Sequence, residues 1–261
     1  MGRAEPVSMG LASSERERYQ REGYLLLPGL FDRDSLGRFE ARFVELASGS
    51  VPPPEGLVVM HDVMVAKGAV QAASPLHAVN KLLSFEADPV LFDYALDPRL
   101  LEGVRSLLGP ELVTISSNVF NKPPGVDGRH PLHQDLRYFA LRPADGILAT
   151  WTAISPCTRK SGCLAVIPGS HRGGLLEHGD PDWEFVNRGF FAAQGIDKGA
   201  RVHVEMEPGD TLLFHPLLLH GSGRNESPGF RRAISVHYAS SACRRPPGPR
   251  KREPVMRPIP T

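Results

Sequence analysis

Cysteine is scarce in this sequence. Its 261 residues include three cysteines, Cys157, Cys163 and Cys243, and no two of them form a CxxC pair. An odd number of cysteines cannot all pair within one chain, which argues against a disulfide scaffold and fits a reducing compartment. We therefore expect three free thiols and an intracellular protein.

Long hydrophobic runs and an excess of one charge are also missing. The longest apolar run near the start, residues 24–31, is interrupted by Pro28 and Gly29, and a membrane-spanning helix needs about 20 apolar residues. Lys and Arg total 30 against 29 Asp and Glu, a net charge of +1. This balance provides no general attraction to nucleic acid or acidic lipid. We expect neither a nucleic-acid partner nor membrane insertion, and the oligomeric state stays open.

Neither end of the sequence reads as a targeting signal. Pro6 stands where an N-myristoylation motif requires Ser or Thr, and the last residues, Ile259-Pro260-Thr261, differ from a Ser-Lys-Leu address. The two ends therefore leave the compartment open.

The elements change character near the middle of the chain. With 41% hydrophobic residues, the composition is that of a globular protein, and one domain is the default. Helices are expected over residues 12–22, 32–48 and 77–109, with a short strand after residue 23 and Asp-Pro pairs starting helices at positions 88 and 97. From residue 111 onward, five β-rich runs are separated by turns. This order predicts an α+β, mainly β fold, in which helices buttress an antiparallel double-sheet roll or barrel.

A metal-binding pattern lies in "HPLHQDLRYF", residues 130–139. On a strand, His133 and Asp135 point to the same side and Gln134 to the other. His-x-Asp supplies two of the three ligands of a two-His-one-carboxylate site. His220 ends an apolar run and opens into Gly221, which suits the third ligand better than His215 beside Pro216.

A cationic strand follows His220. The run "FRRAISVHY" (230–238) is expected to form a strand beside that of His220 and to bring an arginine near the metal. A guanidinium binds a carboxylate through two parallel hydrogen bonds, as a dicarboxylate cosubstrate requires. Strand parity does not choose between Arg231 and Arg232. Ser222 shares a face with His220 and could add a hydroxyl donor.

Seven segments in order resemble one enzyme family. The segments are 121–124 (NKPP), 130–136 (HPLHQDL), 151–153 (WTA), 161–164 (SGCL), 167–171 (IPGSH), 207–211 (EPGDT) and 214–223 (FHPLLLHGSG). Together they resemble the phytanoyl-CoA dioxygenase family of Fe(II)/2-oxoglutarate oxygenases, from about Tyr19 to Cys243. This resemblance implies a double-stranded β-helix (jelly roll) over residues 19–243, with an N-terminal extension (1–18) and a proline-rich basic tail (244–261) that we expect to be disordered.

The resemblance also implies an activity. Members use Fe(II), 2-oxoglutarate and O2, with ascorbate as a reductant, to hydroxylate C2 of a branched fatty acyl-CoA such as phytanoyl-CoA. The reaction releases succinate and CO2 in the peroxisome as part of fatty-acid alpha-oxidation. No peroxisomal signal is visible here, so the cytosol is the alternative compartment.

The resemblance also implies roles for individual residues, which are assigned to the matching positions of this sequence. The resemblance gives His133, Asp135 and His220 as iron ligands, and it selects Arg231 over Arg232 as the partner of the far carboxylate of 2-oxoglutarate. The remaining residues implied at the cosubstrate site are Ser222, Trp151, Lys81, Asn118 and Gln134. Asn118 replaces a methionine of the family. Cations expected near the CoA end are Lys122, Arg129, Arg137 and Arg142.

Two other readings stay open. The family's enzyme continues past its last strand with a charged helical segment, whereas this sequence turns into the proline-rich tail. The chain could therefore be a catalytically impaired member that binds 2-oxoglutarate or acyl-CoA. A zinc hydrolase with the same ligands ranks behind both, because no HExxH motif is present.

Overall fold

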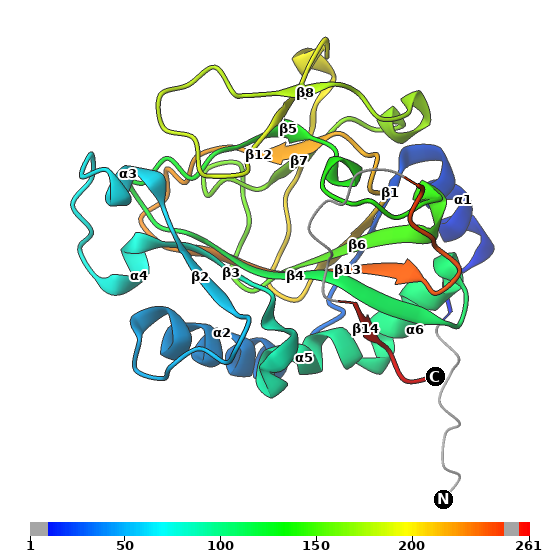
Figure 1. Ribbon diagram of the computed structural model, residues 1–261, viewed down its shortest axis with the longest axis horizontal. Helices are drawn as coiled ribbons and strands as arrows, with labels where there is room; N and C mark the ends of the chain where they lie inside the picture. Colours follow the sequence, from blue (N-terminus) through cyan, green and yellow to red (C-terminus); the bar gives the residue numbers. More distant parts are fainter. Residues whose placement is uncertain (1–9, 248–255) are drawn as a thin grey trace, which may run out of the picture.

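Two antiparallel sheets face each other in the computed structural model, which describes residues 10–247 and 256–261 (Figure 1). The larger sheet has eight strands in the order β1 (Tyr24–Leu27), β11 (Thr211–Phe214), β6 (Ile147–Ala153), β13 (Arg231–Ser240), β4 (Leu112–Lys122), β3 (Val79–Leu83) and β2 (Val58–His61), with β14 (Arg257–Pro258) also paired to β4. The smaller sheet has the order β10 (Val202–Val204), β7 (Leu164–Val166), β12 (His220–Ser222) and β5 (His130–His133). A ribbon of β8 (His178–Gly179) and β9 (Ala192–Ala193) forms a third, small sheet.

Helices cover the outer face of the larger sheet. The α-helices are α1 (Ser13–Glu22), α2 (Arg33–Ser48), α3 (Val63–Ala66), α4 (Pro75–Ala78), α5 (Pro89–Leu96) and α6 (Pro98–Leu108). Short 3-10 turns are η1 (Phe85–Ala87), η2 (Asp135–Arg137), η3 (Ala144–Gly146), η4 (Ser170–Gly173) and η5 (Lys198–Ala200). Figure 1 shows α2, α5 and α6 beneath the larger sheet. The expected α+β jelly roll with buttressing helices is therefore confirmed.

Aspartates start three of the covering helices. The side chains of Asp32, Asp88 and Asp97 accept hydrogen bonds from backbone N–H groups in the first turns of α2, α5 and α6. Such N-caps satisfy donors that a helix leaves free, and proline at the first helical position costs no hydrogen bond. The helix starts predicted at the two Asp-Pro pairs are confirmed.

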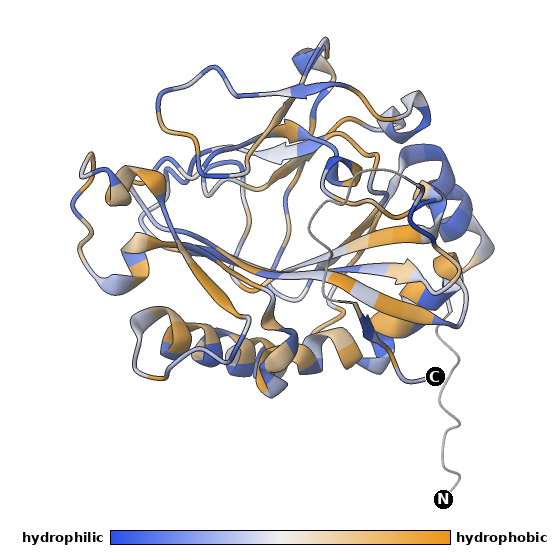
Figure 2. Ribbon diagram, viewed as in Figure 1, coloured by the Kyte–Doolittle hydropathy of each residue, from blue (hydrophilic) through white to orange (hydrophobic). Residues whose placement is uncertain are grey.

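Alternation along the strands of the larger sheet separates two cores. Ile234, Val236 and Tyr238 of β13 pack in the cluster under the helices, whereas Ala233 belongs to the cluster between the sheets. Tyr238 donates its hydroxyl to the Ala95 carbonyl of α5 at 2.9 Å. In Figure 2, hydrophobic and hydrophilic residues alternate along α2, while α1 is mostly hydrophilic. The inner face of β13 is thus free to carry the polar side chains of a site.

Two local predictions from the sequence are wrong. Residues 79–83 form strand β3 instead of a helix, because they pair with β4 and β2 at the side of the larger sheet, and tertiary pairing outweighs a weak helical pattern. The Arg231 strand β13 does not run beside β12. It pairs with β4 and β6 in the larger sheet, while β12 lies in the smaller one. Arg231 therefore faces the ligand histidines across the roll.

The ends of the described chain also differ from expectation. The boundary placed at residue 18 falls inside α1, and Leu11 is buried in the core, so residues 10–18 belong to the same fold. Residues 256–261 are ordered against the sheet: β14 pairs with Thr114 and Val113 where β3 has already ended, and Ile259 is buried. The predicted disorder of the tail is wrong for these six residues, while residues 248–255 lie outside the described part. No helix in the described ranges is long and apolar enough to cross a membrane.

Candidate metal and cosubstrate site

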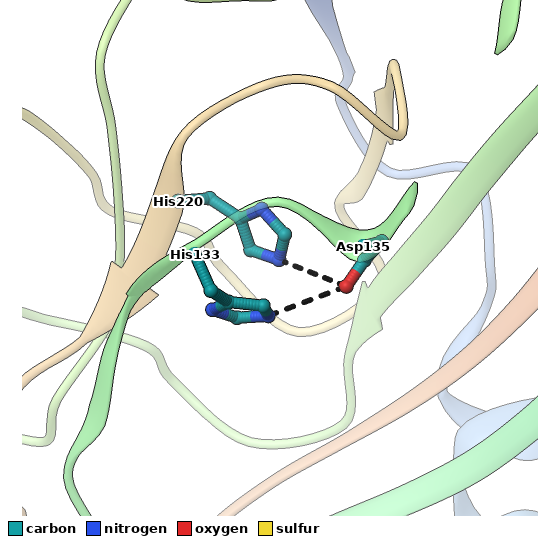
Figure 3. A group of neighbouring side chains, drawn as sticks. All are labelled: His133, Asp135 and His220. Atoms are coloured by element: carbon teal, nitrogen blue, oxygen red, sulfur yellow. Dashed lines mark ion pairs between the residues drawn. The ribbon is translucent and has the colours of Figure 1, made fainter. Parts of the chain in front are cut away.

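Three potential metal ligands converge between the sheets. One ligand atom from each of His133, Asp135 and His220 lies within 4.8 Å of the others, and all three residues are buried. The Nε2 atoms of His133 and His220 lie 3.2 and 3.7 Å from the same oxygen, Oδ1, of Asp135 (Figure 3). His133 ends β5 and His220 begins β12, its direct neighbour. Asp135 lies just beyond the strand, in η2, and not on the strand as expected.

Backbone carbonyls orient both histidines. The Nδ1 atom of His133 lies 2.8 Å from the Pro131 carbonyl oxygen, and that of His220 lies 3.0 Å from the Leu218 carbonyl oxygen. An Nδ1–H that donates to a carbonyl leaves Nε2 as the free lone pair, which is how metal-bound imidazoles are commonly fixed. Burial lowers the pKa of His220 to about 4, so this ring is neutral and can act as a ligand near neutral pH.

A third histidine holds the other oxygen of the carboxylate. Nε2 of His237 lies 2.7 Å from Oδ2 of Asp135. Burial alone would raise the pKa of Asp135, but the nearby His220 and His237 outweigh it and hold the pKa well below its usual value. The carboxylate is therefore ionised, with one oxygen tied back and the other directed at the two ligand histidines. Two imidazole nitrogens and one carboxylate oxygen are the donor set of non-heme Fe(II) sites.

One cavity connects this cluster to the expected cosubstrate residues. His133, Asp135 and His220 line it together with Arg231, Ser222 and Trp151. The Arg231 guanidinium lies 5.4 Å from the centre of the Trp151 ring and donates through Nη2 to the Gly162 carbonyl oxygen at 3.1 Å. Its Nε is buried without a hydrogen-bond partner among the described residues. An unpaired buried donor beside the cavity fits a ligand carboxylate.

The structure also separates the two adjacent arginines. Arg231 points into the cavity, whereas Arg232 lies on the helix-covered face, where its Nη1 pairs with Glu40 and its Nε donates to the Asn121 side chain at 3.1 Å. Strand parity left this choice open. The side chain of Arg232 is engaged by Glu40 and Asn121 outside the cavity, whereas that of Arg231 faces a ligand inside it.

Three expected residues do not line this cavity. Lys81 is close to it: its Nζ lies 5.7 Å from the centre of the Phe120 ring and 5.2 Å from that of Phe190, two rings that do line it, and burial lowers the pKa of Lys81 to about 8. Asn118 donates to Ser116 Oγ at 3.3 Å. Gln134 does not line the cavity. Its side-chain Nε2 donates to the Gly174 and Leu217 carbonyl oxygens, and its Oε1 accepts from the Leu176 N–H.

Among the cavity residues that sequence reasoning did not place there are His237 and Lys122. His237 shares the strand parity of Arg231, which could have indicated it. Lys122 was expected near the CoA end, but the residue is 5% exposed and lines the cavity itself. Because β4 and β13 pair with Lys122 directly opposite Arg231, only the strand register could have placed it there.

The comparison with protein families gives a direct match. A family model described as "Phytanoyl-CoA dioxygenase (PhyH)" matches residues 19–233. The chain belongs to the phytanoyl-CoA dioxygenase family. A "Probable phytanoyl-CoA dioxygenase" of Caenorhabditis elegans is 43% identical over 243 residues, which cover 90% of this chain and 77% of that protein. "Phytanoyl-CoA dioxygenase, peroxisomal" of Mus musculus is 43% identical over 238 residues, covering 89% of this chain and 70% of that protein.

A solved structure supports the fold of this phytanoyl-CoA dioxygenase family member. The epimerase SnoN, crystallised in complex with Fe3+, alpha ketoglutarate and nogalamycin RO, superposes with a TM-score of 0.66. The two chains are 21% identical, and the match covers 90% of this chain and 85% of SnoN. At this identity the likeness concerns the fold, and the resemblance inferred from the sequence is confirmed by the family match.

Proposed function

We propose that the protein is an Fe(II)- and 2-oxoglutarate-dependent dioxygenase that hydroxylates C2 of a branched fatty acyl-CoA such as phytanoyl-CoA. Succinate and CO2 are the products of the cosubstrate. The observation that carries the proposal is one cavity that holds His133, Asp135 and His220 within 4.8 Å of one another and, in the same cavity, Arg231. Membership of the phytanoyl-CoA dioxygenase family, and the similarity to phytanoyl-CoA dioxygenases of worm and mouse, support the choice of substrate.

Each residue of the cavity has a role in this reaction. His133, Asp135 and His220 would hold Fe(II) on one face and leave positions for 2-oxoglutarate and O2. Bound iron would supply the oxygen activation that couples oxidative decarboxylation of 2-oxoglutarate to hydroxylation of the substrate, with ascorbate keeping it reduced. Arg231 would bind the far carboxylate, Ser222 would add a hydroxyl donor and Trp151 would form the wall beside the guanidinium.

The remaining expected residues have more distant roles. Lys81 lies between two rings of the wall and would act on the cosubstrate only after a shift toward it.

The impaired-member alternative is not favoured, because the ligand triad and Arg231 are all buried in one cavity. We propose the peroxisome as the compartment of the protein, because the mouse relative is a peroxisomal enzyme.

Succinate and CO2 production from 2-oxoglutarate tests the proposal. The Fe(II)-loaded protein is assayed with and without phytanoyl-CoA, and formation of the 2-hydroxyacyl-CoA is followed by mass spectrometry. Turnover stimulated by the acyl-CoA is the expected result. Binding of 2-oxoglutarate without turnover on phytanoyl-CoA or other acyl-CoA esters would instead support the impaired-member reading.

A further inference from the structure

A second buried cation stands beside Arg231. Lys122 of β4 lies directly opposite Arg231 of β13, and both side chains line the cavity that contains the ligand triad. We infer that Lys122 and Arg231 together bind the far carboxylate of 2-oxoglutarate, so that Lys122 is a second anion-binding residue of the cosubstrate pocket. This inference rests on the proposed function, because it names a further residue for the same cosubstrate.

Backbone contacts bring the two cationic groups to the same end of the cavity. Lys122 Nζ donates to the Gly223 carbonyl oxygen at 2.5 Å, and Arg231 Nη2 donates to the Gly162 carbonyl oxygen at 3.1 Å. The Gly162 and Gly223 segments touch: a Cβ added at Gly162 would lie 2.7 Å from the Gly223 carbonyl oxygen. Two neighbouring backbone segments therefore anchor the ammonium and the guanidinium side by side.

No carboxylate of the described residues forms an ion pair with either cation. Asp135, the acidic residue that lines the cavity, is held at the other end by His133, His220 and His237. Asp127 attracts Lys122 from a distance, but it is paired with Arg129 at 2.6 Å and Arg224 at 3.1 Å. Lys122 and Arg231 are 5% and 2% exposed. Holding both groups charged in a buried cavity without a counter-ion is costly, and a bound anion would remove that cost.

The ammonium has donors to spare. Lysine offers three N–H groups, and one contact, to the Gly223 carbonyl oxygen, is made within the described part of the chain. Burial and the positive charge of Arg231 lower the pKa of Lys122 well below its usual value. The neutral Gly223 carbonyl does not stabilise the charged form of Lys122, whereas a bound carboxylate would. With the unpartnered Nε of Arg231, the free lysine donors match the two oxygens of one carboxylate.

Calorimetry with two 2-oxo acids tests the inference. The anaerobic Fe(II)-loaded protein is titrated with 2-oxoglutarate and with 2-oxobutyrate, which has the same 2-oxo acid head but no far carboxylate. Lys122→Met is expected to weaken 2-oxoglutarate binding by on the order of 10- to 100-fold, the effect of losing a hydrogen bond to a charged group. Binding of 2-oxobutyrate should stay unchanged, which also shows that the variant is folded.

Two further variants complete the design. Lys122→Arg keeps a positive charge and should recover part of the affinity for 2-oxoglutarate, whereas Lys198→Met removes an exposed lysine and should alter neither ligand. Unchanged 2-oxoglutarate binding by Lys122→Met would overturn the inference, as would an equal loss for both ligands, since that is the mark of a structural tie to Gly223. Wild-type protein that binds neither 2-oxo acid would overturn the proposed function as well.

Discussion

The two ends of the cavity are completed in different ways. At the metal end, protein groups orient one another: each ligand histidine is tied through Nδ1 to a carbonyl, and Oδ2 of Asp135 is tied to His237, so that the two Nε2 lone pairs and Oδ1 converge. At the other end, Lys122 and Arg231 line the cavity, and neither forms an ion pair with a carboxylate of the described residues. The first end is preorganised before any ligand arrives, and the second is completed only by an anion.

This difference separates two kinds of experiment. Changes at the metal end should act on metal binding and therefore on every ligand that the metal holds. Changes at the cationic end should act only on ligands that carry a far carboxylate. The following variants test that division, beginning with the one that should do most.

Removing the carboxylate ligand should have the largest effect. Asp135→Ala deletes the single anionic ligand and leaves His133, His220 and His237 without their common partner. We expect succinate formation to fall to the level of the protein-free reaction, and the same for His133→Ala, while the far-ultraviolet circular dichroism stays that of a folded protein. Wild-type turnover in either variant would show that the ligand assignment is wrong.

Removing the guanidinium should affect the cosubstrate alone. Arg231→Ala loses paired charge-assisted hydrogen bonds, so the 2-oxoglutarate concentration for half-maximal succinate formation should rise by about 100-fold. Arg231→Lys should recover only part, because an ammonium lacks the planar fork. Arg232→Ala is the matched control: it breaks the pair with Glu40 on the other face and should leave the 2-oxoglutarate requirement unchanged. A similar rise in the 2-oxoglutarate requirement of both alanine variants would contradict the assignment of Arg231 alone to the cosubstrate.

Much of this arrangement could be predicted from the sequence. Local signals were sufficient for the helices capped by Asp88 and Asp97 and for the change to strands after residue 111. The ligand triad followed from His-x-Asp and from the position of His220 at the end of an apolar run. These features depend on residues close together in the chain, where spacing alone determines which side chains meet.

Long-range pairing could not be predicted in the same way. Nothing local to residues 79–83 indicates that they pair with β4, and nothing in the loop after His220 shows that β13 crosses to the opposite sheet. Lys122 illustrates the consequence. Its place beside Arg231 depends on the register between strands more than 100 residues apart, so the sequence alone suggested a cation near the CoA end. The ordered β14 is a similar case, because it fills a part of β4 that β3 leaves unpaired.

The His237 contact is a milder test of the metal end. His237→Phe removes the donor to Oδ2 of Asp135 while keeping a ring of similar size beside Phe139, whose ring centre is 4.9 Å away. Loss of such an orienting partner typically lowers metal affinity by about 10- to 100-fold. Anaerobic titration with Fe(II) should show this decrease, and His237→Gln should restore part of it. Unchanged Fe(II) affinity in His237→Phe would mean that Asp135 is oriented without this contact.

Asn118 should have the smallest effect and so marks the limit of the pocket. The resemblance implies a cosubstrate contact, yet the amide donates to Ser116 and does not line the cavity with Phe120, its neighbour on the same strand face. Asn118→Met, the family's residue, should therefore change the 2-oxoglutarate requirement by less than about threefold, because the side chain that it replaces does not line the cavity. Succinate formation measured over a range of 2-oxoglutarate concentrations checks this. A tenfold change or more would place Asn118 against the cosubstrate and extend the binding end of the cavity along β4 toward Ser116.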